Sequence, residues 1–344
     1  MENLLVKNMI SIIVLNYNGK KWLKKCLDSL CAQTYKNFEI IFVDNASSDN
    51  SIEFVENNYK DDRIKIIKSD KNLGFAGGNN LGFQYVKGEY ILLLNNDTWA
   101  QENYLEKFIK AFQEIPNAAS IQSKMILMDS IEKLDGCGSY WSDSSFLYHY
   151  GFGKNQSLEK YNKTMQFFSN KGASIMIRKD VIDQIGLFDE DFWCYYEDTD
   201  FCHHAWLAGY ECWYYPEAVM YHAGSGTTIT LQNSYIQFHN FKNKLLSFLK
   251  NFEVWTLIKI LPVYLILNIA LSLFWLFQGK WRHFLALYQA IWWNILHFRQ
   301  TMKKRRVVQS FRKKKDAEIF KQVKRNPKLI YYYYLLTGLE KYEE

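Results

Sequence analysis

The sequence of 344 residues lacks several features that define common classes of protein. Its six cysteines form no CxxC pair and show no zinc-ligand spacing, which argues against a zinc site or a disulfide framework. The N-terminal stretch Met-Glu-Asn-Leu-Leu-Val-Lys has no hydrophobic core of a signal peptide. We therefore expect reduced thiols in a cytoplasmic protein.

Two familiar nucleotide-binding motifs are also missing. The segment Gly74-Phe75-Ala76-Gly77-Gly78-Asn79-Asn80 is rich in glycine, but it does not follow GxGxxG and contains no Walker lysine. Neither a dinucleotide-binding turn nor a P-loop fits this pattern. A glycine-rich helix start that lies near a diphosphate is still compatible with it.

The composition shows what is present. A hydrophobic content of 48% is ample for a full core, so disorder is not expected. The net charge of +6 is unevenly spread, because many cations gather near the C-terminus. Such a cluster is typical of a contact with anionic lipid or nucleic acid. Its members are Lys303, Lys304, Arg305, Arg306, Arg312, Lys313, Lys314 and Lys315.

Short apolar runs alternate with segments of helical spacing through the first hundred residues. This alternation predicts an α/β fold with an open, mostly parallel sheet and helices on both faces. Beyond residue 105 the pattern loosens into a helix and mixed short strands. The expected strands are 9–16, 38–43, 64–67, 90–94, 171–177 and 211–215, and the expected helices are 22–32, 51–58, 72–86, 180–185 and 203–208.

Polar residues follow the expected parallel strands where each one ends. They are Asn16, Asp44-Asn45 and Asn95-Asn96-Asp97. In open α/β sheets ligands collect at this edge, so the polar residues mark the place where a nucleotide would bind. A carboxylate at the end of a buried strand can also hold a divalent cation.

A second acidic run, Glu197-Asp198-Thr199-Asp200, follows the aromatic residues Trp193, Tyr195 and Tyr196. A carboxyl group in an aromatic setting can serve as a general base, because limited solvation raises its pKa. The alternative is that these carboxylates only cap the helix expected at 203–208.

Together these motifs resemble the family 2 glycosyltransferases, which are inverting enzymes of the GT-A fold, and in particular the branch that contains bacterial rhamnosyltransferases. The resemblance covers roughly residues 9–250. It rests on five motifs in order: Ser11-Ile12-Ile13-Val14-Leu15-Asn16-Tyr17-Asn18, Val43-Asp44-Asn45-Ala46-Ser47-Ser48-Asp49, Asn72 to Asn80, Leu94-Asn95-Asn96-Asp97, and Tyr196-Glu197-Asp198-Thr199-Asp200 followed by His222.

The resemblance implies a role for each motif. Asp97 matches the aspartate that binds Mg²⁺ or Mn²⁺ bridged to the donor diphosphate, and His222, in a loop expected at 221–227, matches a further metal ligand. Asp198 matches the catalytic base, with Glu197 and Asp200 as rivals that orient the acceptor or cap the helix. The nucleotide pocket is expected to contain Asn16, Asp44, Asn45, Asn72, Gly78, Asn96 and Asp97.

Asparagine stands at position 95, where a full Asp-X-Asp motif has its first aspartate. Fewer anionic ligands should make the metal affinity weak without a nucleotide. The alternatives are that Asn95-Asn96-Asp97 is only a polar turn and that His222 is structural.

We expect a catalytic domain over residues 1–235, with a nucleotide half (about 1–100) and an acceptor half (about 101–235), and a helical C-terminal region over 236–344. Residues 254–277 are apolar and long enough to span a bilayer. A hairpin with 281–298 would place Lys280, Arg282 and His283 far from the cytoplasm, so a helix in the headgroup plane fits better. The alternative is a homodimer that buries the same apolar surface.

The resulting hypothesis is a metal-dependent transfer of L-rhamnose from dTDP-rhamnose to a glycan or a polyprenyl-linked saccharide, on the cytoplasmic side of the cell membrane. The alternatives are a UDP-sugar donor (GlcNAc, Gal or galactofuranose) and a non-catalytic, membrane-bound scaffold that binds sugar nucleotides. No nucleic-acid partner is expected, because no base-stacking module accompanies the basic cluster.

Overall fold

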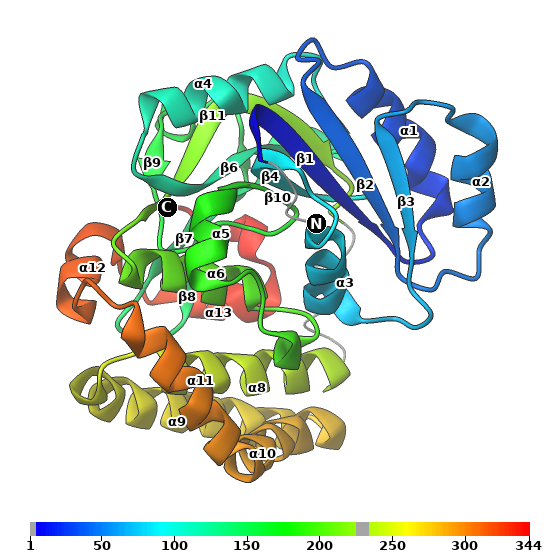
Figure 1. The fold of residues 1–344 in the computed structure, drawn as a ribbon. Helices are drawn as coiled ribbons and strands as arrows, with labels where there is room; N and C mark the ends of the chain where they lie inside the picture. The colour runs from blue at the N-terminus through cyan, green and yellow to red at the C-terminus, as the bar shows by residue number, and fades with distance from the viewer. Residues whose placement is uncertain (1–4, 225–233) are drawn as a thin grey trace.

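The computed structural model describes residues 5–224 and 234–344 of the chain. Its centre is a mixed sheet with helices on both faces (Figure 1), which confirms the predicted α/β class. The strand order is β3-β2-β1-β4-β10-β6-β11-β5.

The parallel half of the sheet comes from the first hundred residues. Strands β1 (Val6–Asn16), β2 (Phe38–Asp44), β3 (Ile64–Lys68) and β4 (Gly88–Asn95) alternate with α1 (Lys20–Cys31), α2 (Ser51–Asn58) and α3 (Gly74–Phe83). The register pairs Asn16 with Asp44 and Leu15 with Asn95. The carboxyl ends of three strands therefore meet at one edge, as predicted.

The second half of the sheet is mixed. Strand β10 (Ser174–Arg178) runs antiparallel to β4 and β6, whereas β11 (Glu211–His222) runs parallel to β6 (Ala118–Leu127). Strands β7 (Ser130–Trp141) and β8 (Leu147–Asn155) form a hairpin, and β5 (Thr98–Ala100) and β9 (Met165–Gln166) pair with β11. The short strands expected between 105 and 170 were therefore wrong, since β6 to β8 are long. Helices α4 (Tyr104–Glu114), α5 (Lys179–Ile185) and α6 (Glu197–Leu207) complete this half.

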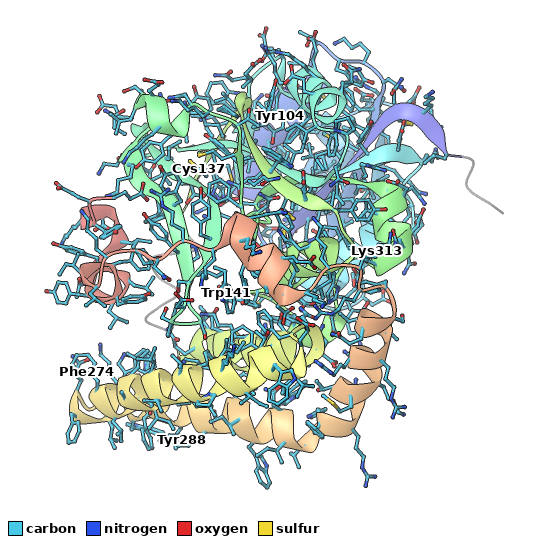
Figure 2. The ribbon with its side chains drawn as sticks, turned by 90° about the vertical axis from the view of Figure 1, so that its left-hand side faces the viewer. Tyr104, Cys137, Trp141, Phe274, Tyr288 and Lys313 are labelled. Carbon is cyan, nitrogen blue, oxygen red and sulfur yellow. The ribbon has the colours of Figure 1, made fainter. Side chains whose placement is uncertain are left out.

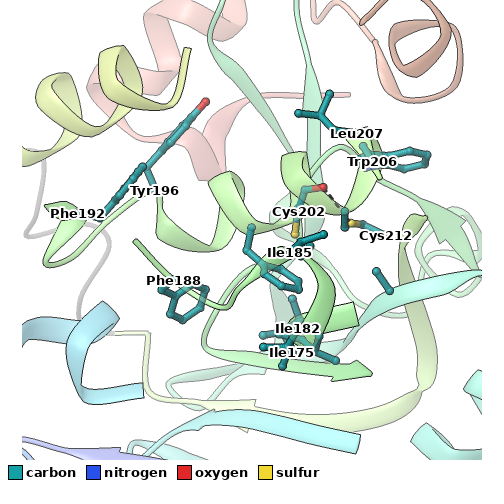
Figure 3. Packing of buried hydrophobic residues seen from close by; sticks show 14 of the residues in the cluster. Ile175, Ile182, Ile185, Phe188, Phe192, Tyr196, Cys202, Trp206, Leu207 and Cys212 are labelled. Atoms are coloured by element: carbon teal, nitrogen blue, oxygen red, sulfur yellow. Dashed lines mark hydrogen bonds between the residues drawn. The ribbon is translucent and has the colours of Figure 1, made fainter. Parts of the chain in front are cut away.

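Successive side chains on the strands point alternately into two hydrophobic clusters, one on each face of the sheet. On β1, Ile13 packs into one cluster while Ile12 and Val14 pack into the other. The first cluster continues under α5 and α6, where Ile182 and Cys202 lie together (Figure 3). Each face of the sheet is thus buried, which explains why its strands read as continuous apolar runs.

Two boundaries differ from the sequence expectation near the acidic run and the predicted loop. Helix α6 begins at Glu197, so the acidic residues form its first turn and do not precede it. His222 is the last residue of β11, so the predicted loop over 221–227 begins only at Ala223, and its residues 225–227 lie outside the described residues. Helix α3 (Gly74–Phe83) is shorter at both ends than the helix expected over 72–86.

Helices α8 (Ser234–Asn251), α9 (Val254–Phe277), α10 (Trp281–Leu296) and α11 (Phe298–Ser310) form a layer at one end of the molecule (Figure 1). The chain then returns through α12 (Asp316–Val323) and α13 (Ile330–Thr337) to the β7–β8 hairpin. There the N–H of His149 donates to the Tyr331 hydroxyl oxygen at 3.0 Å. The C-terminal region is thus attached to the rest of the chain by more than its apolar helices.

Part of the basic cluster at 303–315 is used inside the protein, so that only some of its members are free to contact anionic lipid. Lys304 pairs with Asp189 and Asp191, and Arg312 pairs with Asp316 at 2.9 Å. Arg305 donates to the backbone carbonyl groups of Leu249 and Phe252, at 2.7 Å each. The cluster members that remain exposed are Lys303, Arg306, Lys313 and Lys315.

Candidate active site

The ends of β1 and β2 are joined by buried polar side chains. The amide of Asn16 donates to Asp44 Oδ1 at 2.9 Å, and Asp44 Oδ2 accepts the N–H of Ser47 at 2.9 Å. The amide of Asn96, after β4, donates to Asn16 Oδ1 at 2.6 Å. Three of the predicted pocket residues, Asn16, Asp44 and Asn96, therefore form one continuous network at the carboxyl edge of the sheet.

Asn45 and Asn72 belong to a second network, at the start of α3. Asn45 Nδ2 donates to Asn72 Oδ1 at 3.0 Å, and Asn45 Oδ1 accepts the N–H of Leu73 at 2.8 Å. The N–H of Gly74 donates to Asn72 Oδ1, and that of Ala76 donates to the Trp193 carbonyl. These N–H groups at the start of the helix already have partners, so the structure does not support a diphosphate on the glycine-rich segment.

Gly78 lies on α3 where the helix crosses β1. A Cβ atom there would lie 2.5 Å from Leu15 Cδ1 and 3.3 Å from the amide nitrogen of Asn45. The glycine is therefore required for close packing of the helix on the strand, and its predicted place in the nucleotide pocket gains no support from its contacts.

Asp97 and His222 are brought together by strand pairing. His222 is paired with Thr98 of β5, and the N–H of Ala223 donates to the Asp97 carbonyl at 3.0 Å. As a result, His222 Nε2 lies 3.2 Å from Asp97 Oδ1. A carboxylate oxygen and an imidazole nitrogen that lie next to each other could serve as ligands of Mn²⁺, and the carboxylate also suits Mg²⁺.

Within residues 5–224 and 234–344, no group of three or more acidic, histidine or cysteine side chains could hold a metal ion. A cation held by Asp97 and His222 would therefore depend on oxygen atoms from a phosphate ligand. The expectation that metal affinity is weak without a nucleotide stays a prediction.

A residue that sequence analysis missed lies behind His222. Asp135 of β7 is buried, and its Oδ2 lies 2.7 Å from His222 Nδ1 and 2.7 Å from Lys171 Nζ. Burial favours the neutral acid, but the Lys171 charge and the His222 contact outweigh it and lower the pKa of Asp135 to about 2. Burial likewise disfavours charged His222, yet hydrogen bonds to Asp135 and Asp97 raise the pKa of His222 to about 9.

Asp198 lies on the first turn of α6, with its carboxylate held in place by backbone groups. Its Oδ2 accepts the N–H of Gly172 at 2.8 Å, and its Oδ1 accepts the N–H of Thr199 at 2.6 Å. Burial raises the pKa of Asp198 above its usual range, although these two hydrogen bonds favour the charged form. The carboxylate is therefore fixed in direction, in surroundings that favour its protonated form.

The two rivals of Asp198 have different surroundings. Glu197 is buried, and burial followed by the charge of Asp198 raises the pKa of Glu197 well above its usual range. Asp200 is buried as well, but Lys250 of α8 lies 2.9 Å from its Oδ2. The carboxylate of Asp200 therefore forms an ion pair with Lys250 and is not available as a free base.

The turn before α6 has an unusual backbone that α8 supports. Trp193, Tyr195 and Tyr196 all have positive φ values, which are uncommon for residues of this size. Asn243 Nδ2 lies 2.6–3.0 Å from the carbonyl oxygens of three residues in this turn: Phe192, Cys194 and Tyr195. Sequence analysis could not find this support, because a single asparagine in a helix carries no recognisable signal.

Known glycosyltransferases are similar in sequence to part of this chain. Glycosyltransferase GlyG of Streptococcus pneumoniae serotype 4 is 36% identical over 110 residues, which are 32% of this chain and 36% of that protein. The UDP-Glc:alpha-D-GlcNAc-diphosphoundecaprenol beta-1,3-glucosyltransferase WfaP of Escherichia coli is 38% identical over 91 residues, or 26% of this chain and 36% of that protein. The chain thus matches about a third of the length of these relatives.

A crystal structure of GalNAc-T7 with UDP, GalNAc and Mn²⁺ has a similar fold. The TM-score is 0.58 at 14% sequence identity, and the likeness covers 74% of this chain and 50% of that one. At such low identity the likeness establishes the fold alone. The family model described as glycosyl transferase family 2 matches residues 11–186. Since that match covers half of the chain, the protein is a member of glycosyl transferase family 2.

Proposed function

We propose that the protein transfers a sugar from a nucleotide-diphosphate donor with inversion, using Asp97 and His222 to hold a divalent cation and Asp198 as the base. One observation carries this proposal. The N–H of Asn95, beside Asp97, donates to the Ala173 carbonyl at 3.0 Å, and the neighbouring Gly172 holds Asp198. The backbone before Asp97 is therefore hydrogen-bonded to the segment that holds the Asp198 carboxylate, which supports the proposal.

The charges of the site suit direct displacement. Asp198 would accept the proton of an acceptor hydroxyl as that oxygen bonds to the anomeric carbon and the bond to the diphosphate breaks. Attack opposite the leaving group inverts the anomeric configuration. A Mg²⁺ or Mn²⁺ ion bound by Asp97 and His222 supplies charge neutralisation for the departing diphosphate.

The donor is proposed to be a UDP-sugar or dTDP-rhamnose. The resemblance to rhamnosyltransferases favours the dTDP sugar, whereas the similarity to WfaP, a transferase that uses UDP-Glc, favours a UDP sugar. Slow donor hydrolysis measured over a panel of UDP-, dTDP- and GDP-sugars would identify it. Turnover of dTDP-rhamnose with no turnover of UDP-sugars would decide for rhamnose, and the reverse pattern would exclude it.

Replacing Asp97 with alanine should abolish the gain in nucleotide affinity that Mn²⁺ provides, because only His222 would remain as a protein ligand. Calorimetric titration of UDP and of dTDP, each with and without Mn²⁺, measures this gain. Asp62→Ala, which removes an exposed carboxylate in the turn before β3, is the control and should keep the full gain. A metal-dependent gain that survives in Asp97→Ala would contradict the assignment.

The acceptor is proposed to be a saccharide on a polyprenyl lipid, with the protein attached to the membrane surface. Helix α9 is long and apolar enough to cross a membrane by length and composition, yet it lies against the catalytic half. Its buried stripe includes the polar residues Asn268 and Ser272. Apart from Lys259, its outward face is mostly apolar, and the large exposed side chains are Val254, Trp255, Ile258, Val263, Ile266, Leu267, Ile269, Leu273, Phe274, Leu276 and Phe277.

Helix α10 extends this apolar face, which favours lipid as its partner. It lies beside α9 at the same end of the molecule (Figure 2) and exposes Trp281, Trp292, Ile295 and Leu296. Exposed cations beside the two helices, Lys280 and Arg282, complement anionic headgroups. The arrangement suits helices that lie in the headgroup plane.

The six cysteines are free thiols, which fits the cytoplasmic side.

Replacing Ile266 with serine should weaken partitioning onto vesicles of phosphatidylglycerol and phosphatidylcholine by about tenfold or more, because burying one such side chain in apolar surroundings is worth about 1.5–3 kcal/mol. Ile131→Ser on β7 is a matched control, since Ile131 is 64% exposed and Ile266 is 66% exposed. Co-sedimentation with vesicles measures the change. A variant that dissociates a dimer and leaves vesicle binding unchanged would show that a second copy covers this face.

A further inference from the structure

The buried carboxylate of Asp135 has a position that the proposed reaction does not yet explain. It is 2% exposed, lies on the strand β7, and comes 87 residues before His222 in the chain. A buried carboxylate is costly unless cations and hydrogen bonds satisfy it. Here both partners, Lys171 and His222, bind the same oxygen, Oδ2, at 2.7 Å each.

This arrangement fixes the direction of the His222 ring. Oδ2 of Asp135 accepts from the Lys171 ammonium, which can only donate, so this oxygen acts as an acceptor and the hydrogen atom in the Asp135–His222 contact belongs to Nδ1 of the imidazole. The other ring nitrogen, Nε2, then faces Asp97 Oδ1 across 3.2 Å. Strand pairing places the His222 backbone, but only a contact with the ring can choose which nitrogen faces Asp97.

Asp135 also connects the two sides of the site. Lys171, which neutralises its charge, directly precedes Gly172, and the N–H of Gly172 holds Asp198. The second oxygen of Asp135, Oδ1, is buried and has no hydrogen-bond partner among the described residues. A carboxylate that serves only packing would not need to keep both a histidine and a lysine on one oxygen.

We infer that Asp135 is a positioning residue that holds His222 with Nε2 toward Asp97, and so completes the pair of side chains that binds the divalent cation. The inference rests on the proposed metal-dependent transfer. Carboxylates that orient a metal-binding histidine in this way contribute about 10- to 100-fold to metal affinity or activity.

The Asp135→Asn variant tests the inference through binding and does not need turnover. We expect the gain in UDP affinity that Mn²⁺ provides to fall by about 10- to 100-fold, with UDP affinity in the absence of metal unchanged. In a His222→Ala background the same substitution should cause no further loss of the gain. A purely structural role would instead change the metal-free affinity and act equally in both backgrounds.

Glu39→Gln is the matched control. Glu39 is another buried carboxylate, and its Oε1 accepts from the Ser11 hydroxyl at 2.6 Å and from the N–H of Lys87 at 2.7 Å, away from the Asp97–His222 pair. This variant should lose stability and keep the full Mn²⁺-dependent gain. If folded Asp135→Asn keeps the gain within about twofold of wild type, the inference is overturned.

A second measurement uses the wild-type protein, in case Asp135→Asn does not fold. NMR of the chain with ¹⁵N-labelled histidine, bound to UDP and Mg²⁺, should show His222 protonated at Nδ1 and not at Nε2. The signal of His222 is identified among those of the seven histidines because it is lost in His222→Gln. Protonation at Nε2 overturns the inference. If wild type itself shows no metal-dependent gain in affinity for UDP or dTDP, the proposed metal site fails, and the role of Asp135 fails with it.

Discussion

Replacing Asp198 with asparagine should lower kcat by about 10²- to 10⁴-fold, the contribution that a positioned general base makes to proton transfer. UDP affinity should stay within about twofold of wild type, because the asparagine keeps the shape of the side chain and Asp198 does not touch the Asp97–His222 pair through any described hydrogen bond. Steady-state kinetics with the identified donor, together with calorimetry of UDP, separates the two effects.

Glu197→Gln is the control for this experiment. Glu197 is the neighbouring carboxyl group, and burial raises its pKa well above the usual range, so that its charged form is disfavoured. Its neutral replacement should therefore change kcat much less than Asp198→Asn does. Near-normal turnover by Asp198→Asn, or an equal loss of turnover in Glu197→Gln, would contradict the assignment of Asp198 as the base. Wild-type protein that binds UDP but transfers no sugar would favour a scaffold.

The pH dependence of kcat gives an independent check on Asp198. A base must be ionised, and burial raises the pKa of Asp198 above the usual value of about 3.9. Activity should therefore fall as the pH drops through a midpoint higher than that of an ordinary aspartate. The acidic limb should disappear in Asp198→Asn, because the residual reaction no longer depends on this group.

Local patterns were sufficient to predict the nucleotide half of the fold. Each parallel strand is an apolar run that ends in a polar residue; Asn16, Asp44 and Asn95 stand at three such ends, and Asp97 follows two residues after Asn95. Because strands of one direction bring their carboxyl ends to the same edge, sequence order alone placed these residues together. Helix α9 was also predicted correctly, since its apolar run has sharp ends.

Contacts between distant segments could not be predicted in this way. Asp135 and Lys171 are 36 residues apart, and neither lies in a periodic pattern that marks a site. Lys250 and Asn243 look like residues of an exposed helical face, because nothing local shows that α8 packs against the turn before α6. The ion pairs inside the basic cluster could not be predicted for the same reason, since the acidic partners of Lys304 lie more than a hundred residues earlier.

Replacing Lys250 with methionine should lower the free energy of unfolding by about 3–5 kcal/mol, which is the usual cost of removing one partner of a buried ion pair. Lys250 is 1% exposed and pairs with Asp200 at 2.9 Å and with Asp189 at 2.7 Å. Methionine fills similar space but leaves the carboxylate of Asp200 buried without its cation. Urea denaturation at pH 7, followed by circular dichroism, measures the loss.

The effect of pH distinguishes a lost charge from lost packing. Burial favours the neutral acid, but Lys250 and His204 outweigh it and hold the pKa of Asp200 well below its usual range. In wild type Asp200 therefore adds stability above its unfolded pKa of about 3.9, and this stability is lost as the pH falls toward the folded pKa. Without Lys250 the pKa should rise, so the deficit should be largest at neutral pH and shrink as Asp200 gains a proton.

Two further variants complete the experiment. Lys250→Met combined with Asp200→Asn should recover part of the stability, because no charge is left buried opposite the methionine. Lys24→Met, which removes an exposed partner of Asp28, should cost less than about 0.5 kcal/mol. A loss below about 1 kcal/mol in Lys250→Met would mean that water or another cation reaches Asp200. Because Asp200 lies two residues after Asp198 on α6, a confirmed loss would also show that α8 holds the helix that carries the proposed base.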